Sequence, residues 1–436
     1  SFPTRRSSDL CYVAEQPYPE GNGMHALIVR DVQKAMALLS AAFYGFPQDD
    51  LYVVAFTGTK GKTTSAYFLK GIFDQMNGGH TALFSSVDRV VGTAPDQTFK
   101  SDLTTPESLD LFRDMRTAVD NDMTHLVMEV SSQAYKKSRV FGLTYDLGFF
   151  LNISPDHIGP NEHPNFDDYL HSKLQLMVNS RKCIINAETD RFDEVYAAAK
   201  TTTNPDSIYL FSGADFKQPK NAQEIDVRFK SLESDMQKSR FAVETLSPNA
   251  KKMKIAGDYE LSLIGDFNEL NATAAIIAGG LAGANHELAA KGIKDVKIPG
   301  RMQTLTTKKH GEIVVDYAHN LASMNALMSF LEREFDDPKI IVVLGAPGDK
   351  GVSRRADFSQ ALNKYADTVF LTTDDPGYED PMDIANEIDV GINHERVEVI
   401  FELDRPKAIA DAIALSKPGD IVVLAGKGED KMQKVR

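Results

Sequence analysis

The stretch that most constrains the fold of this chain is LYVVAFTGTKGKTTSAYFLKGIF, residues 51–73. An apolar, β-branched run over 51–56 predicts a buried strand, and apolar residues return at helical spacing over 67–73. The loop between them, with the first residues of the predicted helix, contains Gly58, Thr59, Lys60, Gly61, Lys62, Thr63 and Thr64. The sequence therefore predicts a strand, a glycine-bearing loop and a helix in immediate succession.

This order is typical of a nucleotide phosphate site. Glycines let backbone N–H groups approach phosphate oxygens, and the helix N-terminus adds partial positive charge. Lys62 supplies a cation for the β- and γ-phosphates, and the Thr63 hydroxyl can ligate magnesium. Phe56 stands where the usual pattern has its first glycine, so an ordinary tight turn between strand and helix is the alternative.

Composition narrows the class of protein. The 436 residues suffice for two or three domains, and a net charge of −14 argues against a nucleic-acid surface. The two cysteines provide no disulfide framework, and no apolar run approaches the roughly 20 residues of a membrane span. We expect a cytoplasmic protein, a monomer, without a membrane span or a nucleic-acid partner.

We expect four segments along the chain. Residues 1–10, SFPTRRSSDL, resemble a translated sequencing adapter, with a genuine disordered N-terminus as the alternative. Residues 11–48 hold too little for a core of their own and are interpreted as the remnant of an N-terminal domain, and a C-terminal tail is also expected to be missing. The two main domains are predicted over 49–298 and 299–436, with the boundary at Ile298-Pro299-Gly300-Arg301.

Both main domains are predicted to be α/β. In the first, strands and helices alternate, which implies a mostly parallel sheet covered on both faces, and short alternating runs over 227–264 predict a small antiparallel sub-sheet. In the second, we expect a doubly wound, Rossmann-like sheet with strands at 313–317, 340–344, 369–372, 397–400 and 421–425. Ligands of such sheets bind beyond the carboxyl ends of the strands.

Three residues near the predicted phosphate loop could carry chemistry. Glu129 ends a strand and suits a magnesium ligand or a water-positioning group, although a solvated acid is the alternative. His157 follows the next strand and could bind a second cation or phosphate, or be structural. Lys173 shares one helical face with Phe166 and Met177. Burial would depress its pKa, and a neutral amine can be carbamylated to a metal-binding group, with a snorkelling lysine as the alternative.

Further candidates lie later in the chain. Asn268 and Asn271 could bind an adenine edge or cap a helix, Arg301 could reach phosphate, and Asp316 could hold a ribose hydroxyl beside His319. The loops of the second domain carry bases and acids at strand ends: Lys350, Arg354, Arg355, Asp374, Asp375, Gly426, Glu429 and Asp430. The bases suit an anion and the acids a cationic amino acid, although solvated loop charge explains them equally well.

Taken together, these motifs resemble the Mur ligases of peptidoglycan synthesis. The resemblance covers roughly residues 20–436 and is carried by TGTKGKTT, LTTPES, MEVSSQAYKKSR, LNISPDHIGPNEHPNFDDYLHSK, GDFNELNATAA, PGRMQ, VDYAHN, DDPGYEDP and AGKGED. It implies an ATP- and magnesium-dependent amide ligase acting through an acyl phosphate. The subgroup it resembles most adds the third residue of the stem peptide to UDP-N-acetylmuramoyl-L-alanyl-D-glutamate.

The resemblance also implies roles for individual residues. Lys62 and Thr63 would hold ATP phosphates and magnesium, Glu129 and His157 would ligate magnesium, and Lys173 would be carbamylated. The residues implied in ATP binding are Asn271, Arg301 and Asp316. The residues implied in binding the UDP-linked dipeptide are Thr104, Thr105, Ser131 and Arg139.

The resemblance bears on the amino acid as well. In relatives that use meso-diaminopimelate, the corresponding segment resembles DNPR, whereas this chain has DDPG. Gly377 therefore replaces an arginine, and Asp375 replaces an asparagine. This exchange favours the free ammonium of L-lysine, with Arg354 or Arg355 on its carboxylate and Glu429 or Asp430 facing its side-chain amine. Ornithine, meso-diaminopimelate, a folylpolyglutamate-synthase-like ligase and a P-loop nucleotide switch are the alternatives.

Overall fold

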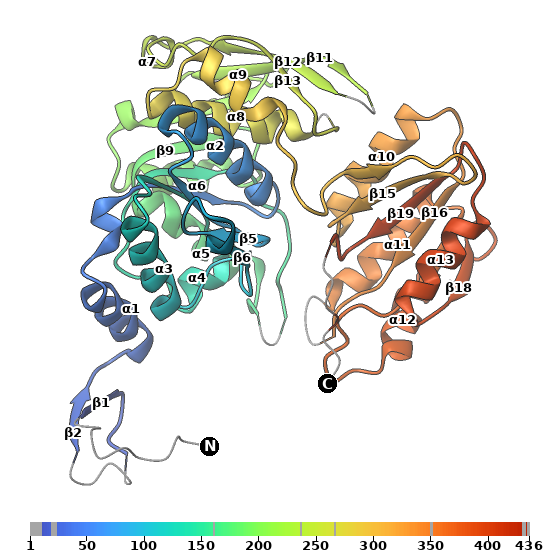
Figure 1. Ribbon diagram of the computed structural model, residues 1–436, viewed down its shortest axis with the longest axis horizontal. Coiled ribbons are helices and arrows are strands. Elements are labelled where there is room, and N and C mark those ends of the chain that lie inside the picture. Colours follow the sequence, from blue (N-terminus) through green and yellow to red (C-terminus); the bar gives the residue numbers. More distant parts are fainter. Residues whose placement is uncertain are drawn as a thin grey trace.

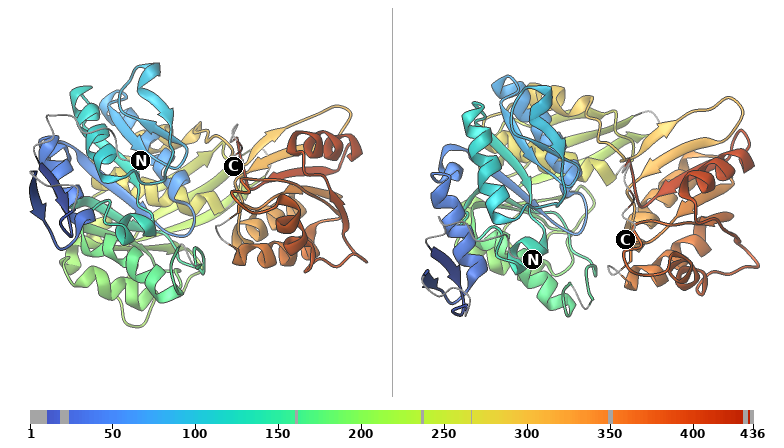
Figure 2. Two further views of the ribbon diagram at one scale, coloured as in Figure 1. Left: turned by 90° about the horizontal axis from the view of Figure 1, so that it is seen from below. Right: turned by 60° about the horizontal axis from the view of Figure 1, so that its bottom comes forward.

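The computed structural model describes residues 11–18, 24–159, 162–235, 238–265, 267–348, 352–429 and 433. The adapter-like segment 1–10, Lys350 and Asp430 lie outside these residues, so the predictions made for them stay predictions. Two α/β units lie side by side, each built around its own sheet (Figure 1; Figure 2).

The first unit is built on a large, mostly parallel sheet. Within the described residues it has 11 strands, in the order β13-β12-β11-β10-β9-β8-β3-β7-β4-β5-β6. The strands are β3 (Tyr52–Thr57), β4 (Thr81–Phe84), β5 (Asp88–Val90), β6 (Thr98–Lys100), β7 (His125–Glu129), β8 (Tyr145–Phe150), β9 (Ser180–Asn186), β10 (Ile208–Gly213), β11 (Val227–Ser234), β12 (Ser239–Thr245) and β13 (Gly257–Leu261).

Helices cover both faces of this sheet because its central strands are apolar on both sides. In β3, Val54 and Phe56 pack with α2 (Lys62–Asn77), α8 (Phe267–Leu281) and α9 (His286–Lys294). The alternate residues Val53 and Ala55 pack on the other face. The helices on that side are α1 (Val32–Phe43), α3 (Ser108–Asp120), α4 (Ser132–Lys136), α5 (Phe166–Val178) and α6 (Phe192–Lys200).

The second unit has the expected doubly wound arrangement. Its sheet has the order β14-β15-β19-β16-β17-β18 within the described residues. The strands are β14 (Gln303–Leu305), β15 (Glu312–Asp316), β16 (Ile340–Leu344), β17 (Thr368–Leu371), β18 (Glu398–Phe401) and β19 (Ile421–Ala425). Three helices pack on one face, namely α10 (Leu321–Glu334), α11 (Ser353–Tyr365) and α12 (Pro381–Asp389), and α13 (Arg405–Leu415) packs on the other.

The structure departs from the sequence predictions in three places. Strands β11, β12 and β13 are antiparallel as expected, but they extend the main sheet, because β11 pairs in parallel with β10. The apolar run over 146–153 predicts one strand, but strand β8 ends at Phe150, since the following residues leave the sheet to contact the glycine loop. Strand β14, an antiparallel edge strand of three residues, was too short to predict.

The smaller elements lie at the periphery. Strands β1 (Cys11–Ala14) and β2 (His25–Ile28) form a parallel pair that projects from the first unit beyond α1 (Figure 1). Helix α7 (Pro248–Lys251) and the 3-10 helices at Pro47–Asp50, Pro95–Gln97 and Pro205–Ser207 are single turns. Among the described residues, no helix is both long and apolar enough to cross a membrane.

Candidate active site

The glycine loop has the strand–loop–helix geometry that the sequence predicts. Gly61 precedes α2 with a φ of 82°, in the left-handed region that side chains disfavour. A Cβ at this position would lie 2.2 Å from Asn271 Oδ1, so close packing against α8 also requires glycine. Helix α2 therefore begins directly after Gly61, so the N–H groups of its first turn lie at the glycine loop.

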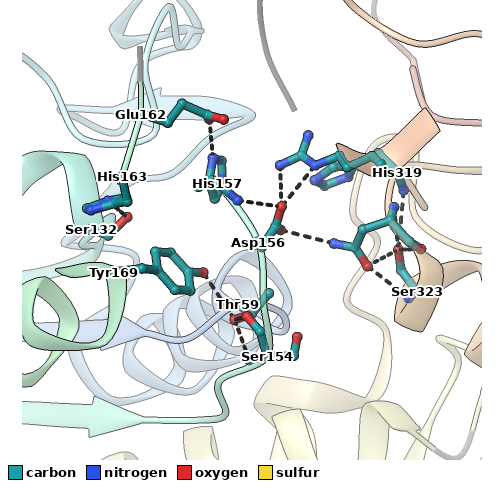
Figure 3. Close-up of polar contacts among 12 residues, drawn as sticks. Thr59, Ser132, Ser154, Asp156, His157, Glu162, His163, Tyr169, His319 and Ser323 are labelled. Carbon is teal, nitrogen blue, oxygen red and sulfur yellow. Dashed lines mark hydrogen bonds and ion pairs between the residues drawn. The ribbon is translucent and has the colours of Figure 1, made fainter. Parts of the chain in front are cut away.

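The residues after β8 hold this loop in place. Lys60 N donates to Asn152 Oδ1 at 2.9 Å, and Asn152 Nδ2 donates back to Lys60 O at 3.1 Å. Ser154 N donates to Thr59 Oγ1 at 3.0 Å, and the Tyr169 hydroxyl lies 3.1 Å from the same oxygen (Figure 3). The sequence analysis did not single out Ser154 or Tyr169, because a contact between residues distant in the chain leaves no periodic signal.

Two lysine amines converge on one carbonyl of the loop. Lys62 Nζ and Lys173 Nζ each donate to Gly58 O at 2.8 Å. Burial lowers the pKa of both amines, and for Lys173, which is 2% exposed, the nearby Lys62 lowers it further. Within the described part of the chain, neither amine has a carboxylate within ion-pair distance. The arrangement offers two potential cations to a ligand that brings its own negative charge.

A buried carboxylate lies beside the start of α2. Thr63 Oγ1 donates to Glu129 Oε1 at 2.9 Å, and Ser86 N donates to the same oxygen at 2.7 Å. Magnesium in nucleotide sites commonly takes one or two protein oxygens and completes its shell with phosphate and water, so this hydroxyl and carboxylate fit the ion. No cluster of three or more His, Cys, Asp or Glu suited to a metal occurs among the described residues.

His157 has a partner that the sequence analysis did not expect. Its Nδ1 lies 2.7 Å from Glu162 Oε1, and its φ of 54° turns the chain sharply at this point (Figure 3). Nearby, the fully buried His163 lies 2.6 Å from Asp168 Oδ2 and 2.9 Å from Ser132 Oγ. His163 was missed by the sequence analysis, and the network fixes the loop that carries His157 between α4 and α5.

The residues implied in dipeptide binding cluster at the carboxyl end of β7. Ser131 N donates to Thr105 Oγ1 at 3.0 Å, and Arg139 NH1 donates to Thr105 O at 3.2 Å. Arg139 also pairs with Glu107 at 2.6 Å, and its buried Nε has no hydrogen-bond partner among the described residues. Thr104 adjoins this group and is partly buried.

The residues implied in ATP binding divide between two elements. Asn268 and Asn271 lie together at the start of α8, where Asn271 Nδ2 is 3.3 Å from Asn268 Oδ1. Arg301 lies 4.9 Å over the Tyr317 ring, and its buried Nε has no hydrogen-bond partner among the described residues. This unsatisfied donor suits an anionic ligand.

Asp316 and His319 are more constrained than the sequence suggested. Both Asp316 oxygens accept backbone N–H groups, from Met302 at 2.9 Å and Ala318 at 2.8 Å, and burial raises its pKa. Burial, aided by the positive charge of Arg354, lowers the pKa of His319 to about 3. His319 is therefore neutral at physiological pH, and its Nδ1 lies 2.7 Å from Tyr317 O.

The two arginines of α11 have different partners. Arg354 reaches across to the first unit, where its Nε and NH2 lie 2.9 and 2.7 Å from Asp156 Oδ1. Arg355 is 2% exposed and pairs within the second unit with Glu379 at 2.8 Å and Glu387 at 2.7 Å. Arg355 thus holds α11 against α12, which argues against the carboxylate-binding role considered for it.

The acids of the second unit are neutralised by the chain itself. Lys427 Nζ lies 3.1 Å from Asp374 Oδ1 and 2.7 Å from Asp375 Oδ1. Arg405 is buried nearby, and the charges of both aspartates act on it. The excess negative charge expected from Asp374 and Asp375 is therefore absent, which corrects the electrostatic argument for a cationic substrate.

Other loop residues of the second unit retain their expected places. Gly377 has a φ of 61° and Gly426 a φ of 93°, both left-handed. A Cβ on Gly300 would lie 2.6 Å from Glu429 N, so the linker between the units packs directly on the last described loop. Glu429 itself is exposed there.

Comparison with known proteins decides the family. The sequence pattern of the Mur ligase middle domain matches residues 56–279, and that of the Mur ligase, glutamate ligase domain matches residues 300–428. The chain belongs to the Mur ligase family. Mur ligases are ATP-dependent ligases of peptidoglycan precursor synthesis that join an amino acid or peptide to a UDP-linked muramoyl substrate, as the motifs predicted.

Individual relatives agree with this assignment. The UDP-N-acetylmuramyl-tripeptide synthetase of Lactobacillus acidophilus is 73% identical over 426 residues, covering 98% of this chain and 82% of that protein. The UDP-N-acetylmuramoyl-L-alanyl-D-glutamate–L-lysine ligase of Enterococcus faecalis is 48% identical, over 97% and 80% of the two chains.

Solved structures show the same fold. A UDP-N-acetylmuramoyl-L-alanyl-D-glutamate–2,6-diaminopimelate ligase has a TM-score of 0.62 and 25% identity, covering 97% of this chain and 83% of that one. A folylpolyglutamate synthase of Mycobacterium tuberculosis has a TM-score of 0.67 but 16% identity, over 91% and 92% of the chains. The latter is a likeness of fold alone.

Proposed function

We propose that this Mur ligase adds L-lysine to UDP-N-acetylmuramoyl-L-alanyl-D-glutamate in the cytoplasm. The convergence of Lys62 and Lys173 on Gly58 O, beside the Thr63–Glu129 pair, carries the proposal for the phosphate chemistry. In it, the terminal carboxylate of the dipeptide attacks the γ-phosphorus and releases ADP. The amine then attacks the acyl carbon, loses its proton, and the tetrahedral intermediate expels inorganic phosphate.

The chain's own residues serve this reaction by holding like charges together. ATP and a carboxylate repel one another, so cations must lie where their oxygens meet. Lys62 and the N-terminus of α2 would bind the phosphates, with Arg301 approaching from the second unit. The dipeptide would lie along Thr104, Thr105, Ser131 and Arg139, which surround the end of β7.

Magnesium and a carbamylated lysine belong to this proposal. Thr63 and Glu129 would hold one magnesium ion, and His157 a second, where the ions would offset phosphate charge. Lys173 is buried, and burial lowers its pKa, which favours the neutral amine that reacts with carbon dioxide. The carbamate would supply the anionic oxygens that this side of the loop otherwise lacks.

The preference for L-lysine rests on the loop after β17 and on the relatives. Gly377 has a left-handed conformation. An arginine at this position, as in the DNPR-like segment of relatives that use meso-diaminopimelate, would therefore be strained. The Enterococcus faecalis relative is named for L-lysine. Arg354 would bind the α-carboxylate and Glu429 would face the side-chain amine, a role that does not depend on Asp374 or Asp375.

One experiment tests the reaction and the specificity together. Phosphate release from ATP and magnesium is measured with the UDP-linked dipeptide and, in turn, L-lysine, L-ornithine, meso-diaminopimelate or no amino acid. We expect release that depends on lysine, with a product heavier by one lysine residue. Faster release with meso-diaminopimelate would overturn the specificity, and release indifferent to every amino acid would overturn the ligase chemistry.

A further inference from the structure

We propose that Asp156 is a positioning residue that holds the second unit against the phosphate loop, with Asn320 and Arg354 as its partners. Asn320 and Arg354 of the second unit both contact Asp156, which is labelled in Figure 3. The proposal concerns the geometry of the ligase reaction and holds whichever amino acid is joined. Asp156 is fixed to the phosphate loop by the backbone that precedes it, and its side chain binds the second unit.

Asp156 is tied to the phosphate loop through two residues of backbone. The Ser154 peptide is clamped to Thr59 in both directions, because Ser154 N donates to Thr59 Oγ1 at 3.0 Å and Thr59 Oγ1 lies 3.2 Å from Ser154 O. The left-handed turn at His157 then lets His157 N donate to Asp156 Oδ1 at 2.9 Å. The carboxylate is thereby aimed away from the loop, towards the second unit.

On the second unit, Asp156 binds the beginnings of two helices. Asn320 caps α10 with its Oδ1, which accepts Ser323 N at 3.0 Å, and this leaves its Nδ2 to donate to Asp156 Oδ2 at 3.2 Å. Arg354, in the first turn of α11, lies 2.9 and 2.7 Å from Asp156 Oδ1 through Nε and NH2. One carboxylate therefore engages an amide, a guanidinium and the positive ends of two helices.

Because the three residues are buried, their contact favours the relative placement of the two units that the structure shows. The exposed fractions are 6% for Asp156, 7% for Asn320 and 9% for Arg354. Separation of the units would leave these groups to water, whereas sliding of the units would leave a buried carboxylate without its partners. The contact thus favours one relative placement of the two units over nearby alternatives.

Placement matters because the reaction joins groups held by different units. The acyl phosphate forms at the loop of the first unit, and Arg301, Arg354 and Glu429 approach from the second. Attack requires reacting atoms about 3–3.5 Å apart, and a displacement of 1 Å can cost on the order of 100-fold in rate. Asp156 touches neither ATP nor amine in this account and acts by setting that distance.

The test uses a swap of hydrogen-bonding groups. Asn320→Asp keeps the helix cap, because Asp and Asn cap equally well, but sets a second carboxylate against Asp156. Asp156→Asn removes the charge at nearly constant volume. The double variant Asp156→Asn/Asn320→Asp restores a donor and an acceptor in the reverse direction at unchanged net charge. Asn285→Asp, the same change at the cap of α9 away from the contact, is the matched control.

Two readouts separate positioning from a merely structural role. The first is kcat with saturating substrates, together with KM for ATP. The second is the distance distribution between spin labels at Lys220→Cys and Glu395→Cys, exposed sites on the two units, in a Cys11→Ser background where Cys183 remains buried. The distance readout needs no turnover, so it stands even if the proposed substrate is wrong.

We expect Asn320→Asp to lower kcat on the order of 100-fold, with KM for ATP little changed and a broadened distance distribution. The double variant should recover most of the kcat and narrow the distribution, and Asn285→Asp should match the parent. The proposal is overturned if Asn320→Asp leaves the distribution unchanged, or if the double variant is no better than the Asn320→Asp single.

Discussion

The buried lysine amines of the two units of this ligase differ in their charged partners. In the first unit, Lys62 and Lys173 share a carbonyl oxygen and, among the described residues, have no carboxylate within ion-pair distance. In the second, Lys427 lies between Asp374 and Asp375. Burial opposes charge in all three, but the two aspartates raise the pKa of Lys427, whereas the pKa values of Lys62 and Lys173 fall.

The two sites therefore differ in whether their buried charges are already paired within the chain. The phosphate loop is incomplete without an anion, which fits a site for ATP and an acyl phosphate. The acid pair of the second unit is complete without a ligand, so its charge cannot select a cationic substrate. Selection there must come from backbone shape and from other groups such as Glu429.

The largest expected effect is at Lys173. Lys173→Met should lower ligation on the order of 1,000-fold, because a charge-stabilising group is lost, while the melting temperature stays the same or rises, since a buried amine is costly. Phosphate release and thermal unfolding by circular dichroism measure the two effects. Lys251→Met, at an exposed lysine of α7, is the control. A large drop in melting temperature would show that Lys173 is structural.

The same residue offers a test of carbamylation. Removal of dissolved carbon dioxide should lower the activity of the parent enzyme, and added bicarbonate should restore it, because the carbamate forms reversibly on a neutral amine. The activity remaining in Lys173→Met should not respond. Equal responses of the two proteins to bicarbonate would contradict a carbamate at this position.

The next effect tests the other side of the comparison. Lys427→Met should cost about 3 kcal/mol of stability, because it leaves Asp374 buried without its partner. The triple variant Lys427→Met/Asp374→Asn/Asp375→Asn should regain part of that loss. Urea unfolding followed by circular dichroism is suitable, as the chain has no tryptophan. Equal stability losses in Lys427→Met and Lys173→Met would contradict the difference in charge pairing between the two units.

A smaller effect is expected at Gly377. Gly377→Arg should destabilise the protein by about 1 kcal/mol because a side chain is strained at its left-handed φ, and it should not confer use of meso-diaminopimelate. Gly377→Asn, which tolerates this conformation better, is the matched variant. If Gly377→Arg is as stable as Gly377→Asn, or if it gains activity with meso-diaminopimelate, the loop accommodates an arginine without strain.

The last prediction concerns pH. The pKa of His319 is about 3 in the folded protein and near 6.5 when unfolded, so between these values the unfolded chain binds the additional proton. Its contribution to stability is therefore present above about pH 6.5 and lost as the pH falls. His319→Gln should lose less melting temperature than the parent between pH 7.5 and pH 5. The exposed His171→Gln should behave like the parent.

Much of the fold could be predicted from the sequence because local patterns encode it. The bounds of β16 and β19 match the predicted ranges, and the glycine loop lies between its strand and helix as expected. The place of Lys173 on one helical face made burial one of its two interpretations, and the structure shows Lys173 buried. Each of these inferences depends on residues that lie close together in the chain.

Partners distant in sequence could not be predicted in this way. Asp156 and Arg354 are 198 residues apart, and Lys427 and Asp375 are 52 apart. Which charges meet is set by the order of strands in each sheet and by the packing of one unit on the other. The sequence by itself determined the elements, the phosphate loop and the family. Only the tertiary structure decided which charges face a ligand and which face each other, because electrostatic pairing depends on distance in space.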